Sequence, residues 1–395
     1  MRVLFVMRHS GYVRNFEWVL RLLCERGHTV HVAFQRKTKY AQLDPGEIAA
    51  QLSTQYSTFS YGDISIRSDG WGLLGREMRL GLDYLRYLGP EYRDAPKLRE
   101  RARREAPAWV LERSERSPMN TAVGRKALAA WLRIVDRAIP RDPEIDAFIQ
   151  SMRPDVLALT PLIEPGSTQA EYIRSARALG VRTAFCVASW DNLTNKGLIH
   201  GPVDLVTVWN EAMKREAVDL HGVPRTHVVV TGAVPFDHWF DWRPATTREA
   251  FCSRVGLPAS RPYLLYLCSS KFVAPDEAPF IRSWVKRIRE SMYPALRDVG
   301  ILVRPHPQNA EQWQNVDVSD GGPAALDTRG LRVVVGFLRG AGVFGVVAME
   351  ISPIHRRRAA SRLPPRLRGA LSRCLHVPHR RVSRRQACAV RRAHP

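Results

Sequence analysis

The polar insert Ser189–Gly197 carries side chains whose types and spacing could do chemistry. Asp191 supplies a carboxylate that can take a proton from a hydroxyl group. Its neighbour Trp190 has a ring that can stack on a ligand, and Asn192 and Thr194 can hydrogen-bond hydroxyl groups. The alternative is that this stretch only closes an Asx-type turn of a surface loop. The insert therefore points to a polar ligand or to a structural turn.

The elements around the insert follow an α/β pattern. Apolar runs at Thr183–Val187 and Val203–Val208 bracket it, and such short runs are typical of buried parallel strands whose C-terminal loops carry chemistry. The chain also opens with a strand over Val3–Met7, a helix over Val13–Arg26 and a strand over Thr29–Phe34. The loop after the first strand lacks G-x-G-x-x-G, so a nicotinamide or flavin cofactor is unsupported.

The stretch from Trp71 to Arg137 has no strand signal and predicts a helical insertion over about residues 71–140. Arg- and Leu-rich helical patterns run over Leu73–Leu88 and Lys97–Arg113. One interpretation is that a positive helix face meets a membrane surface or an acceptor. The alternative is that the helices are solvated and that their arginines pair with nearby glutamates.

A second α/β domain is predicted over residues 261–350, after a first domain over 1–240. Residues 241–260 contain Pro244 and Pro258 and are expected to link the two. The second domain is expected to begin with the strand Tyr263–Cys268, to continue with a helix over Asp276–Ser291, and to include the strand Ile301–Arg304.

The order of four motifs resembles the GT-B glycosyltransferase superfamily. The motifs are His9-Ser10-Gly11, Thr231–Asp237, Ser269-Ser270 and Val303–Pro307, which contains Arg-Pro-His-Pro. Within this superfamily the chain looks most like bacterial cell-surface polysaccharide glycosyltransferases. Arg-Pro-His-Pro is also similar to glycerophosphotransferases of the teichoic-acid type and to sugar-nucleotide 2-epimerases. The resemblance covers roughly residues 1–313. It implies two Rossmann-like domains, the first on the acceptor side and the second on the donor side.

The resemblance also implies a nucleotide-sugar substrate and no cofactor. A diphosphate leaving group develops negative charge, so it needs cations, hydroxyls and amides. Five residues of the second domain offer such groups and are expected to bind the donor: Ser269, Ser270, Lys271, Arg304 and His306. The alternative is an ordinary solvated turn for the first three and a capping or packing role for the other two.

The first domain is then expected to bind the acceptor and to supply any base. Inverting transfer needs a carboxylate or an imidazole to take the proton of the acceptor hydroxyl. His9 and Asp191 are the candidates, and the contacts to the acceptor or sugar are expected from Ser10, Trp190, Asn192 and Thr194. A retaining enzyme would show a late acidic motif, for which Ala348-Met349-Glu350 is a faint match.

The net charge and the spacing of the cysteines argue against some classes of function. The net charge is +22, but 13 of these excess positive charges lie in Ile351–Pro395, so the remainder is mildly basic. A nucleic-acid-binding body would interleave basic and aromatic residues, which this body does not. The six cysteines form no C-x-x-C pair and no histidine stands at zinc-ligand spacing, so we expect no metal site. We expect a cytoplasmic protein, with peripheral contact to the anionic inner face of the plasma membrane as a further interpretation.

Residues 351–395 form an Arg-rich tail that is predicted not to pack. One interpretation is a polybasic patch that binds anionic lipid or nucleic acid. The favoured hypothesis is that the reading frame changes near Asn315–Gly330, because an Arg-rich, Lys-free composition is what out-of-frame reading of a GC-rich gene would give. The second domain would then be truncated and the product inactive.

The resemblance thus implies a metal-independent transferase of the cell envelope. It would move a sugar from a nucleotide-sugar donor to a cell-surface glycan or a lipid-linked precursor. The alternatives within the same fold are transfer of a glycerol phosphate and epimerisation of a sugar nucleotide. Outside it, the alternatives are an inactive truncated product and a basic-tail protein that binds a membrane or nucleic acid.

Overall fold

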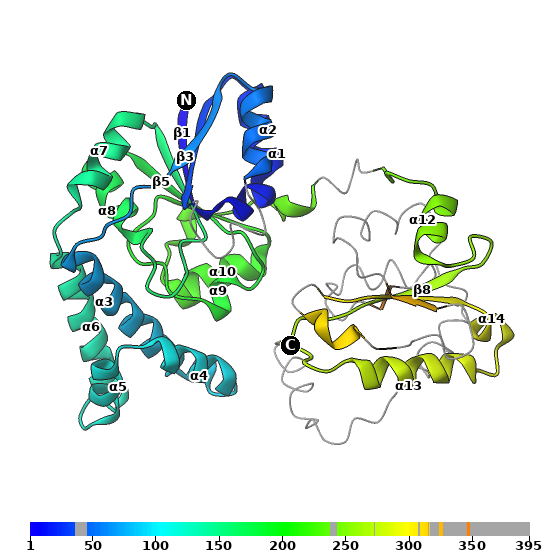
Figure 1. The fold of residues 1–395 in the computed structure, drawn as a ribbon. Helices are drawn as coiled ribbons and strands as arrows, with labels where there is room; N and C mark the ends of the chain where they lie inside the picture. Colours follow the sequence, from blue (N-terminus) through cyan, green and yellow to red (C-terminus); the bar gives the residue numbers. More distant parts are fainter. Residues whose placement is uncertain are drawn as a thin grey trace. The chain divides into compact units, whose positions relative to one another are not determined.

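The computed structural model describes residues 1–35, 46–237, 243–271, 273–306, 309–314, 316, 324–326 and 346–347. The chain divides into two compact units, Met1–Phe240 and Asp241–Pro395, which are coloured blue to green and green to orange in Figure 1. Each unit has its own parallel sheet and its own core. The predicted fold class, two parallel α/β units with a helical insertion in the first, is confirmed. Ala348-Met349-Glu350 and the tail 351–395 lie outside the described residues.

The first unit is built on a seven-stranded parallel sheet in the order β3-β2-β1-β4-β5-β6-β7. The strands are β1 (Arg2–His9), β2 (Thr29–Gln35), β3 (Phe59–Asp63), β4 (Val156–Thr160), β5 (Arg182–Cys186), β6 (Leu205–Val208) and β7 (Val228–Val230). From β1 the chain adds strands on one side as far as β3, then returns to the other side of β1 with β4. This is a doubly wound order whose topological switch point lies between β1 and β4. In such sheets ligands bind outside the carboxyl ends of the strands at the switch point.

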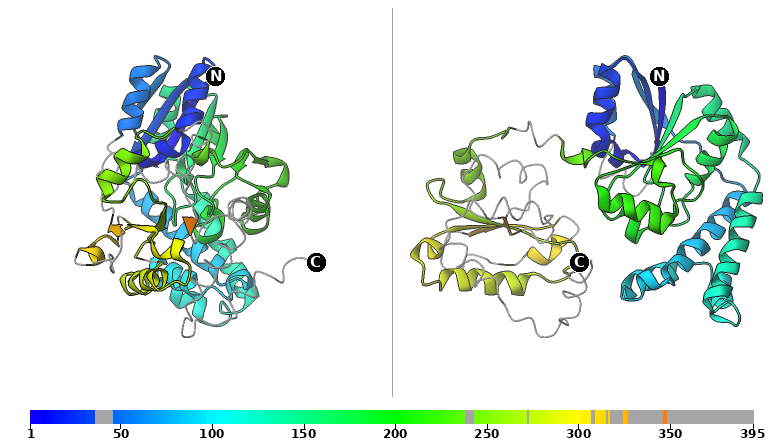
Figure 2. Two further views of the ribbon diagram at one scale, coloured as in Figure 1. Left: turned by 90° about the vertical axis from the view of Figure 1, so that its right-hand side faces the viewer. Right: turned by 180° about the vertical axis from the view of Figure 1, so that it is seen from behind.

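Helices cover both faces of this sheet, as Figure 2 shows from two further sides. They are α1 (Val13–Glu25), α2 (Glu47–Gln55), α7 (Pro143–Met152), α8 (Ala170–Ala178) and α10 (Glu211–His221). Alternate residues of β1 enter two different cores: Leu4 and Val6 pack in one, and Phe5 and Met7 pack in the other. A strand buried on both faces reads as a continuous apolar run, which is why β1 could be predicted from sequence.

The helical insertion leaves the sheet after β3 and returns before β4. It consists of α3 (Gly70–Tyr87), α4 (Pro96–Glu105), α5 (Ala108–Glu115) and α6 (Ala122–Ala138), and has its own core around Met78, Leu82, Leu128 and Leu132. The single helix predicted over Lys97–Arg113 is wrong, because it divides into α4 and α5 at Pro107. Proline has no amide hydrogen and clashes with the preceding turn, so the helix ends there and a new one begins.

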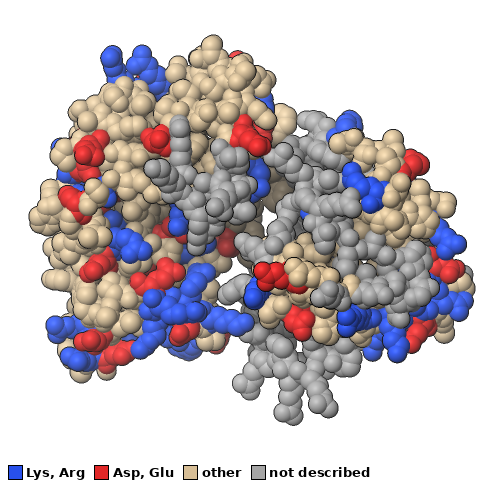
Figure 3. Space-filling model, in the orientation of Figure 1, with Lys and Arg blue, Asp and Glu red and all other residues tan. Residues whose placement is uncertain are grey.

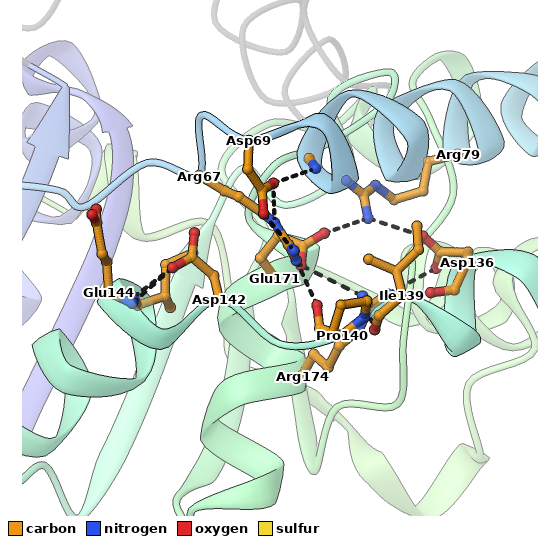
Figure 4. Close-up of polar contacts among 12 residues, drawn as sticks. Arg67, Asp69, Arg79, Asp136, Ile139, Pro140, Asp142, Glu144, Glu171 and Arg174 are labelled. Atoms are coloured by element: carbon orange, nitrogen blue, oxygen red, sulfur yellow. Dashed lines mark hydrogen bonds and ion pairs between the residues drawn. The ribbon is translucent and has the colours of Figure 1, made fainter.

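A buried ion network joins the insertion to the sheet unit, as Figure 4 shows. Glu171 of α8 accepts from Arg79 of α3 at 2.8 Å and from Arg67 at 3.2 Å. All three side chains are at most 3% exposed. Arg79 also reaches Asp136 of α6 at 3.0 Å. Glu171 therefore ties α3 to α8, and Asp136 ties α6 to the same network through Arg79 and through Arg174 of α8.

The second unit contains a four-stranded parallel sheet in the order β10-β9-β8-β11. The strands are β8 (Tyr263–Leu267), β9 (Gly300–Arg304), β10 (Ala324–Leu326) and β11 (Val346–Val347), and the helices are α12 (Arg248–Val255), α13 (Ala278–Arg289) and α14 (Pro294–Arg297). Phe251 and Cys252 of α12 pack against Tyr263 of β8. Residues 241–260, expected to link the domains, therefore contribute a helix to the core of the second unit.

Within the part of the chain that the structure describes, no helix is long and apolar enough to cross a membrane.

Glu171→Gln is expected to lower the free energy of unfolding by about 3 kcal/mol or more, because it leaves two buried guanidinium groups opposite a neutral amide. Urea unfolding followed by circular dichroism measures the change. Glu112→Gln is the control, since Glu112 forms an exposed ion pair with Arg116 and should change the free energy by less than about 1 kcal/mol. Equal effects of the two substitutions would contradict a structural role for the buried network.

Candidate functional site

His9, the last residue of β1, and Ser10, which follows it, lie at the switch point of the first sheet. His9 caps the short 3-10 helix η1 (Ser10–Tyr12): its Nδ1 accepts a hydrogen bond from the Gly11 amide at 3.2 Å. The ring also lies 4.6 Å from the ring of Tyr12, measured between centroids. A neutral imidazole that accepts at Nδ1 carries its proton on Nε2, so in this geometry Nε2 is a donor. Ser10 is buried.

The loop after β4 forms the other side of the switch point and is held by Gln169. The Gln169 amide donates to the carbonyls of Val6 at 3.3 Å and Thr160 at 2.9 Å, and it accepts from the Leu162 amide at 2.7 Å. Leu162 has a φ of 35°, in a region that residues with a side chain rarely adopt. Strained backbone of this kind persists where the surroundings fix it, and it is concentrated at functional sites.

Glu164 lies on the same loop and was not predicted as a site residue. Its carboxylate is 2.7 Å from the Arg8 guanidinium at the end of β1 and 3.9 Å from the Lys196 ammonium in the insert. Glu164 thus brings together the ends of β1, β4 and the segment after β5. The signal available in the sequence was an acidic residue between Pro161 and Pro165, in the segment that follows the apolar run of β4.

The insert folds around the short helix α9 (Asn192–Asn195), and Asp191 precedes it. One carboxylate oxygen of Asp191 accepts from the Ser189 hydroxyl at 2.6 Å, and the other accepts from the Asn195 amide at 2.9 Å. These contacts are those expected of a turn-closing residue. Each carboxylate oxygen can accept more than one hydrogen bond, so the same contacts would also orient Asp191 as a base.

The neighbours of Asp191 have different environments. Asn192 is buried, and its carbonyl oxygen accepts from the amides of Ala188 and Ser189. The Thr194 hydroxyl donates to the backbone carbonyl of Asp191 at 3.2 Å. Trp190 is 64% exposed. Asn192 and Thr194 therefore help to build the turn, whereas Trp190 presents its ring to solvent.

Side chains of the helical insertion cap the carbonyl groups of the insert. The Arg86 guanidinium donates to the carbonyls of Leu193, Lys196 and Gly197. Further donors reach the same row of carbonyls: the Tyr87 hydroxyl to Lys196 at 2.6 Å, the Tyr92 hydroxyl to Thr194 at 3.0 Å and the Arg101 guanidinium to Asn195. The last turn of α9 has too few residues to satisfy its own carbonyls, and the insertion supplies the missing donors.

The carboxylate of Asp83, on α3, holds the loop after β4 and the end of the insert in place. This buried carboxylate accepts from the amides of Gly166 at 2.8 Å and Leu198 at 2.7 Å, and it lies 2.9 Å from Nε2 of the buried His200. A Cβ atom at Gly197 would come within 2.8 Å of this carboxylate, so the backbone there can approach only as glycine. Asp83 thereby fixes the β4 loop and the end of the insert together.

His221, at the end of α10, completes the support of the insert. Its Nδ1 accepts from the Ile199 amide at 3.2 Å, so Nε2 carries the proton and donates to the Leu193 carbonyl at 2.7 Å. Burial, reinforced by the nearby Arg86 charge, lowers the pKa of His221 to about 3. The imidazole is therefore held neutral, which is the form that these two hydrogen bonds require.

In the second unit, the predicted donor-binding residues come together at one edge of the sheet. Strands β8 and β9 are parallel neighbours that pair Leu267 with Arg304, and the Cys268 amide donates to the Arg304 carbonyl at 2.9 Å. Ser269, Ser270 and Lys271 therefore leave one strand beside the place where His306 follows the other. Arg304 is buried and Lys271 is exposed.

Three polar side chains that were not predicted hold these two loops. The Glu277 carboxylate, before α13, accepts from the Ser269 amide at 2.9 and 3.1 Å and from the Tyr266 hydroxyl at 3.2 Å. The Gln312 side chain accepts from the Glu277 amide, and the Asn309 side chain donates to the Ala274 carbonyl. Burial raises the pKa of Glu277, against the opposing effect of the Ser269 amide. The signal available in the sequence was an acidic residue in the first turn of the helix predicted over Asp276–Ser291.

Among the described residues, no group of three or more His, Cys, Asp or Glu side chains is placed to hold a metal ion.

No protein-family model matches the chain, and no curated protein matches it. Solved structures do match. The UDP-GlcNAc 2-epimerase of Methanocaldococcus jannaschii, in complex with UDP-GlcNAc and UDP, is 11% identical over 82% of this chain and 73% of that chain, with a TM-score of 0.40. The spinosyn rhamnosyltransferase SpnG, complexed with thymidine diphosphate, is 14% identical over 83% and 71%, with a TM-score of 0.34. MurG of Acinetobacter baumannii is 12% identical over 82% and 65%, with a TM-score of 0.35.

These structural similarities are low, so the assignment of the fold depends on the strand order of the chain itself. That order gives two parallel α/β units in tandem, which is the architecture that the resemblance to the GT-B superfamily implied.

The state of His221 predicts a pH dependence of stability. The folded protein keeps this imidazole neutral down to about pH 3, whereas the unfolded chain binds a proton below the ordinary pKa of 6.5. Its contribution is therefore fully present above pH 6.5 and is lost as the pH falls from there toward 3. Urea unfolding of His221→Gln should show a shallower fall of the unfolding free energy over this window. A fall as steep as that of the wild type would contradict the assignment.

Proposed function

We propose that the protein is a glycosyltransferase of GT-B type that takes a sugar from a nucleotide-sugar donor. The observation that carries the proposal is the edge of the second sheet, where the loops after β8 and β9 lie side by side. Hydroxyls, an ammonium group and an imidazole gather there on Ser269, Ser270, Lys271 and His306, beside the buried Arg304. Such donors suit the diphosphate of a nucleotide sugar, whose leaving group gains negative charge.

The fixed geometry of these loops supports a binding role. Glu277 and Asn309 hold the first loop at its two ends, at Ser269 and at Ala274. Because the backbone is held before the ligand arrives, little ordering entropy would be lost on binding. No cofactor is part of the proposal, since the nucleotide sugar is itself the substrate.

The first unit is proposed to bind the acceptor at its switch point. There the exposed Trp190 ring would stack on a sugar, Ser10 would contact it, and the Nε2 proton of His9 would be donated to a hydroxyl group. Asp191, oriented by Ser189 and Asn195, would take the proton of the attacking hydroxyl. Asn192 and Thr194 would act through the turn that they build.

The proposed acceptor is a cell-surface glycan or its lipid-linked precursor, on the cytoplasmic side of a bacterial envelope. Epimerisation of the nucleotide sugar is the second candidate, because the donor edge of the second unit would serve both reactions. Incubation with UDP-GlcNAc without any acceptor separates them. An epimerase would form the C2 epimer, detectable by proton NMR, whereas the proposed transferase would leave the sugar unchanged.

Lys271→Ala and His306→Ala are each expected to raise the dissociation constant for UDP about tenfold, because each removes a hydrogen-bond donor to the diphosphate. Isothermal titration calorimetry measures the constant. Lys286→Ala is the matched control, since Lys286 is an exposed lysine on α13 of the same unit and pairs with Glu290. UDP affinity that is the same in all three variants would contradict the proposed donor edge, and no binding of UDP or of other nucleoside diphosphates would contradict the proposed function.

Asp191→Asn is expected to lower kcat by about 100-fold or more while leaving UDP affinity unchanged, because it removes the base and keeps the shape of the side chain. The measurement is steady-state release of nucleoside diphosphate in the presence of lipid extract as acceptor. Glu164→Gln provides the comparison, since Glu164 is a second carboxylate beside the insert. A larger loss in Glu164→Gln would assign the base to Glu164, and unchanged turnover in Asp191→Asn would leave Asp191 as a turn residue.

A further inference from the structure

Helix α6 of the insertion carries apolar side chains on the face that it turns to solvent. Val123, Trp131 and Ile134 are 78%, 50% and 64% exposed. Their positions recur at helical spacing and fall on one stripe along the helix. The opposite face is already buried, where Leu128 and Leu132 pack in the core of the insertion. The exposed stripe is therefore a second apolar face that the fold of this unit does not use.

An aromatic pair extends this stripe onto α5. Trp109, which is 36% exposed, meets the Trp131 ring edge to face, with 5.9 Å between centroids and 87° between planes. The Trp109 indole N–H donates to the Glu77 carboxylate of α3 at 3.2 Å. The two indole rings are thus fixed in orientation at the surface. Tryptophan is the residue best suited to a boundary between water and hydrocarbon, because one end of its ring is polar and the rest is apolar.

Basic residues flank the stripe along the same helix. Lys126, Arg133 and Arg137 are exposed, and their spacing puts them in a row beside the apolar positions. Residues 96–138 contain eleven Lys and Arg but only five Asp and Glu, and four of these acidic residues are ion-paired with arginines. In Figure 3, Lys and Arg atoms gather at the lower edge of the first unit, where Figure 1 draws the insertion.

We propose that this docking face, formed by Val123, Trp109, Trp131 and Ile134 with Lys126, Arg133 and Arg137 beside them, binds the surface of an anionic lipid bilayer. The apolar side chains would enter the boundary between headgroups and acyl chains, and the basic row would meet the lipid phosphates. Apolar burial and charge attraction then act on the same helix, which is the combination that holds amphipathic helices at membrane surfaces.

The positive charge of the docking face favours an anionic bilayer over a second copy of the chain as its binding partner. A symmetric dimer through this face would set the same basic row against itself, and like charges would oppose the contact. A contrast within the first unit supports the choice. Helix α1 also exposes an apolar pair, Trp18 and Leu22 at 46% and 44%, but its charged residues include Glu17 and Glu25. An exposed apolar pair without a uniformly basic flank has no comparable attraction to anionic lipid.

The test is sedimentation of the full chain with extruded vesicles containing about 30 mol% phosphatidylglycerol in phosphatidylcholine, over a range of salt concentrations. The wild type should bind these vesicles, bind pure phosphatidylcholine at least about tenfold more weakly, and lose affinity as salt rises. The double variant Trp131→Ser/Ile134→Ser should bind the anionic vesicles about tenfold more weakly, because it removes the exposed apolar surface. Lys126→Glu/Arg133→Glu should weaken binding at least as much.

Matched controls separate the docking face from surface chemistry in general. Trp18→Ser/Leu22→Ser removes an exposed apolar pair of similar size from α1, and Arg282→Glu/Lys286→Glu makes the same charge change on α13. Both controls should bind vesicles like the wild type. Circular dichroism and UDP calorimetry check that every variant is folded. UDP binding does not depend on vesicles, so failure of this inference leaves the proposed function standing.

Three outcomes would overturn the inference. The first is absence of wild-type binding to the anionic vesicles. The second is an equal loss of vesicle affinity in the α1 or α13 controls, or no loss in either α6 variant. Either result would assign the binding to another surface, such as the Arg-rich tail that all variants share. The third is self-association of the wild type that Trp131→Ser/Ile134→Ser abolishes in analytical ultracentrifugation, which would make the face a contact between copies.

Discussion

Two buried carboxylates, Asp83 and Glu171, fix the helical insertion to the sheet of the first unit, and the shape of the candidate acceptor site depends on them. Glu171 meets the guanidinium groups of Arg67 and Arg79, and Asp83 meets two backbone amides and His200. Removing so much charge from water costs free energy that the ion pairs barely recover, so this arrangement contributes more to uniqueness than to stability. An apolar interface would let the helices slide, whereas these contacts permit one position.

That position decides what the loops at the sheet edge can do. Because α3 and α4 supply the donors for the carbonyls of the insert, the insert cannot adopt its observed turn unless the insertion is docked. Asp191, Asn192 and Thr194 hydrogen-bond within the turn, whereas Trp190 is exposed to solvent. A loop whose backbone is already held by hydrogen bonds loses little conformational entropy when it binds a ligand. The insertion is therefore part of the site, although none of its residues was predicted to belong there.

The sequence predicted elements well where burial imposes a simple period. Strand β1 is apolar throughout because both of its faces are covered, and α1 shows one clear apolar stripe. Strand β3, Phe59–Asp63, was missed because an edge strand with serine, glycine and aspartate carries neither signal. The contacts that hold the site were beyond any local pattern, since Asp83 and His200 are 117 residues apart in the chain. Hydrophobic periodicity shows which face of one helix or strand is buried. It does not show which distant loop the side chains of that element will contact.

The two units illustrate different limits of the same reasoning. In the second unit, residues singled out for their chemistry, Ser269–Lys271 and His306, follow the same ends of two neighbouring strands, because parallel strands bring their carboxyl ends to one edge. In the first unit, His9 ends β1 and Asp191 follows β5, and β4 lies between these two strands. The residue that connects their surroundings is Glu164, on the loop after β4. Strand adjacency, rather than residue type, thus decides which polar groups can act on one ligand. A site inferred from motifs is complete only when the strand that lies between them has been considered.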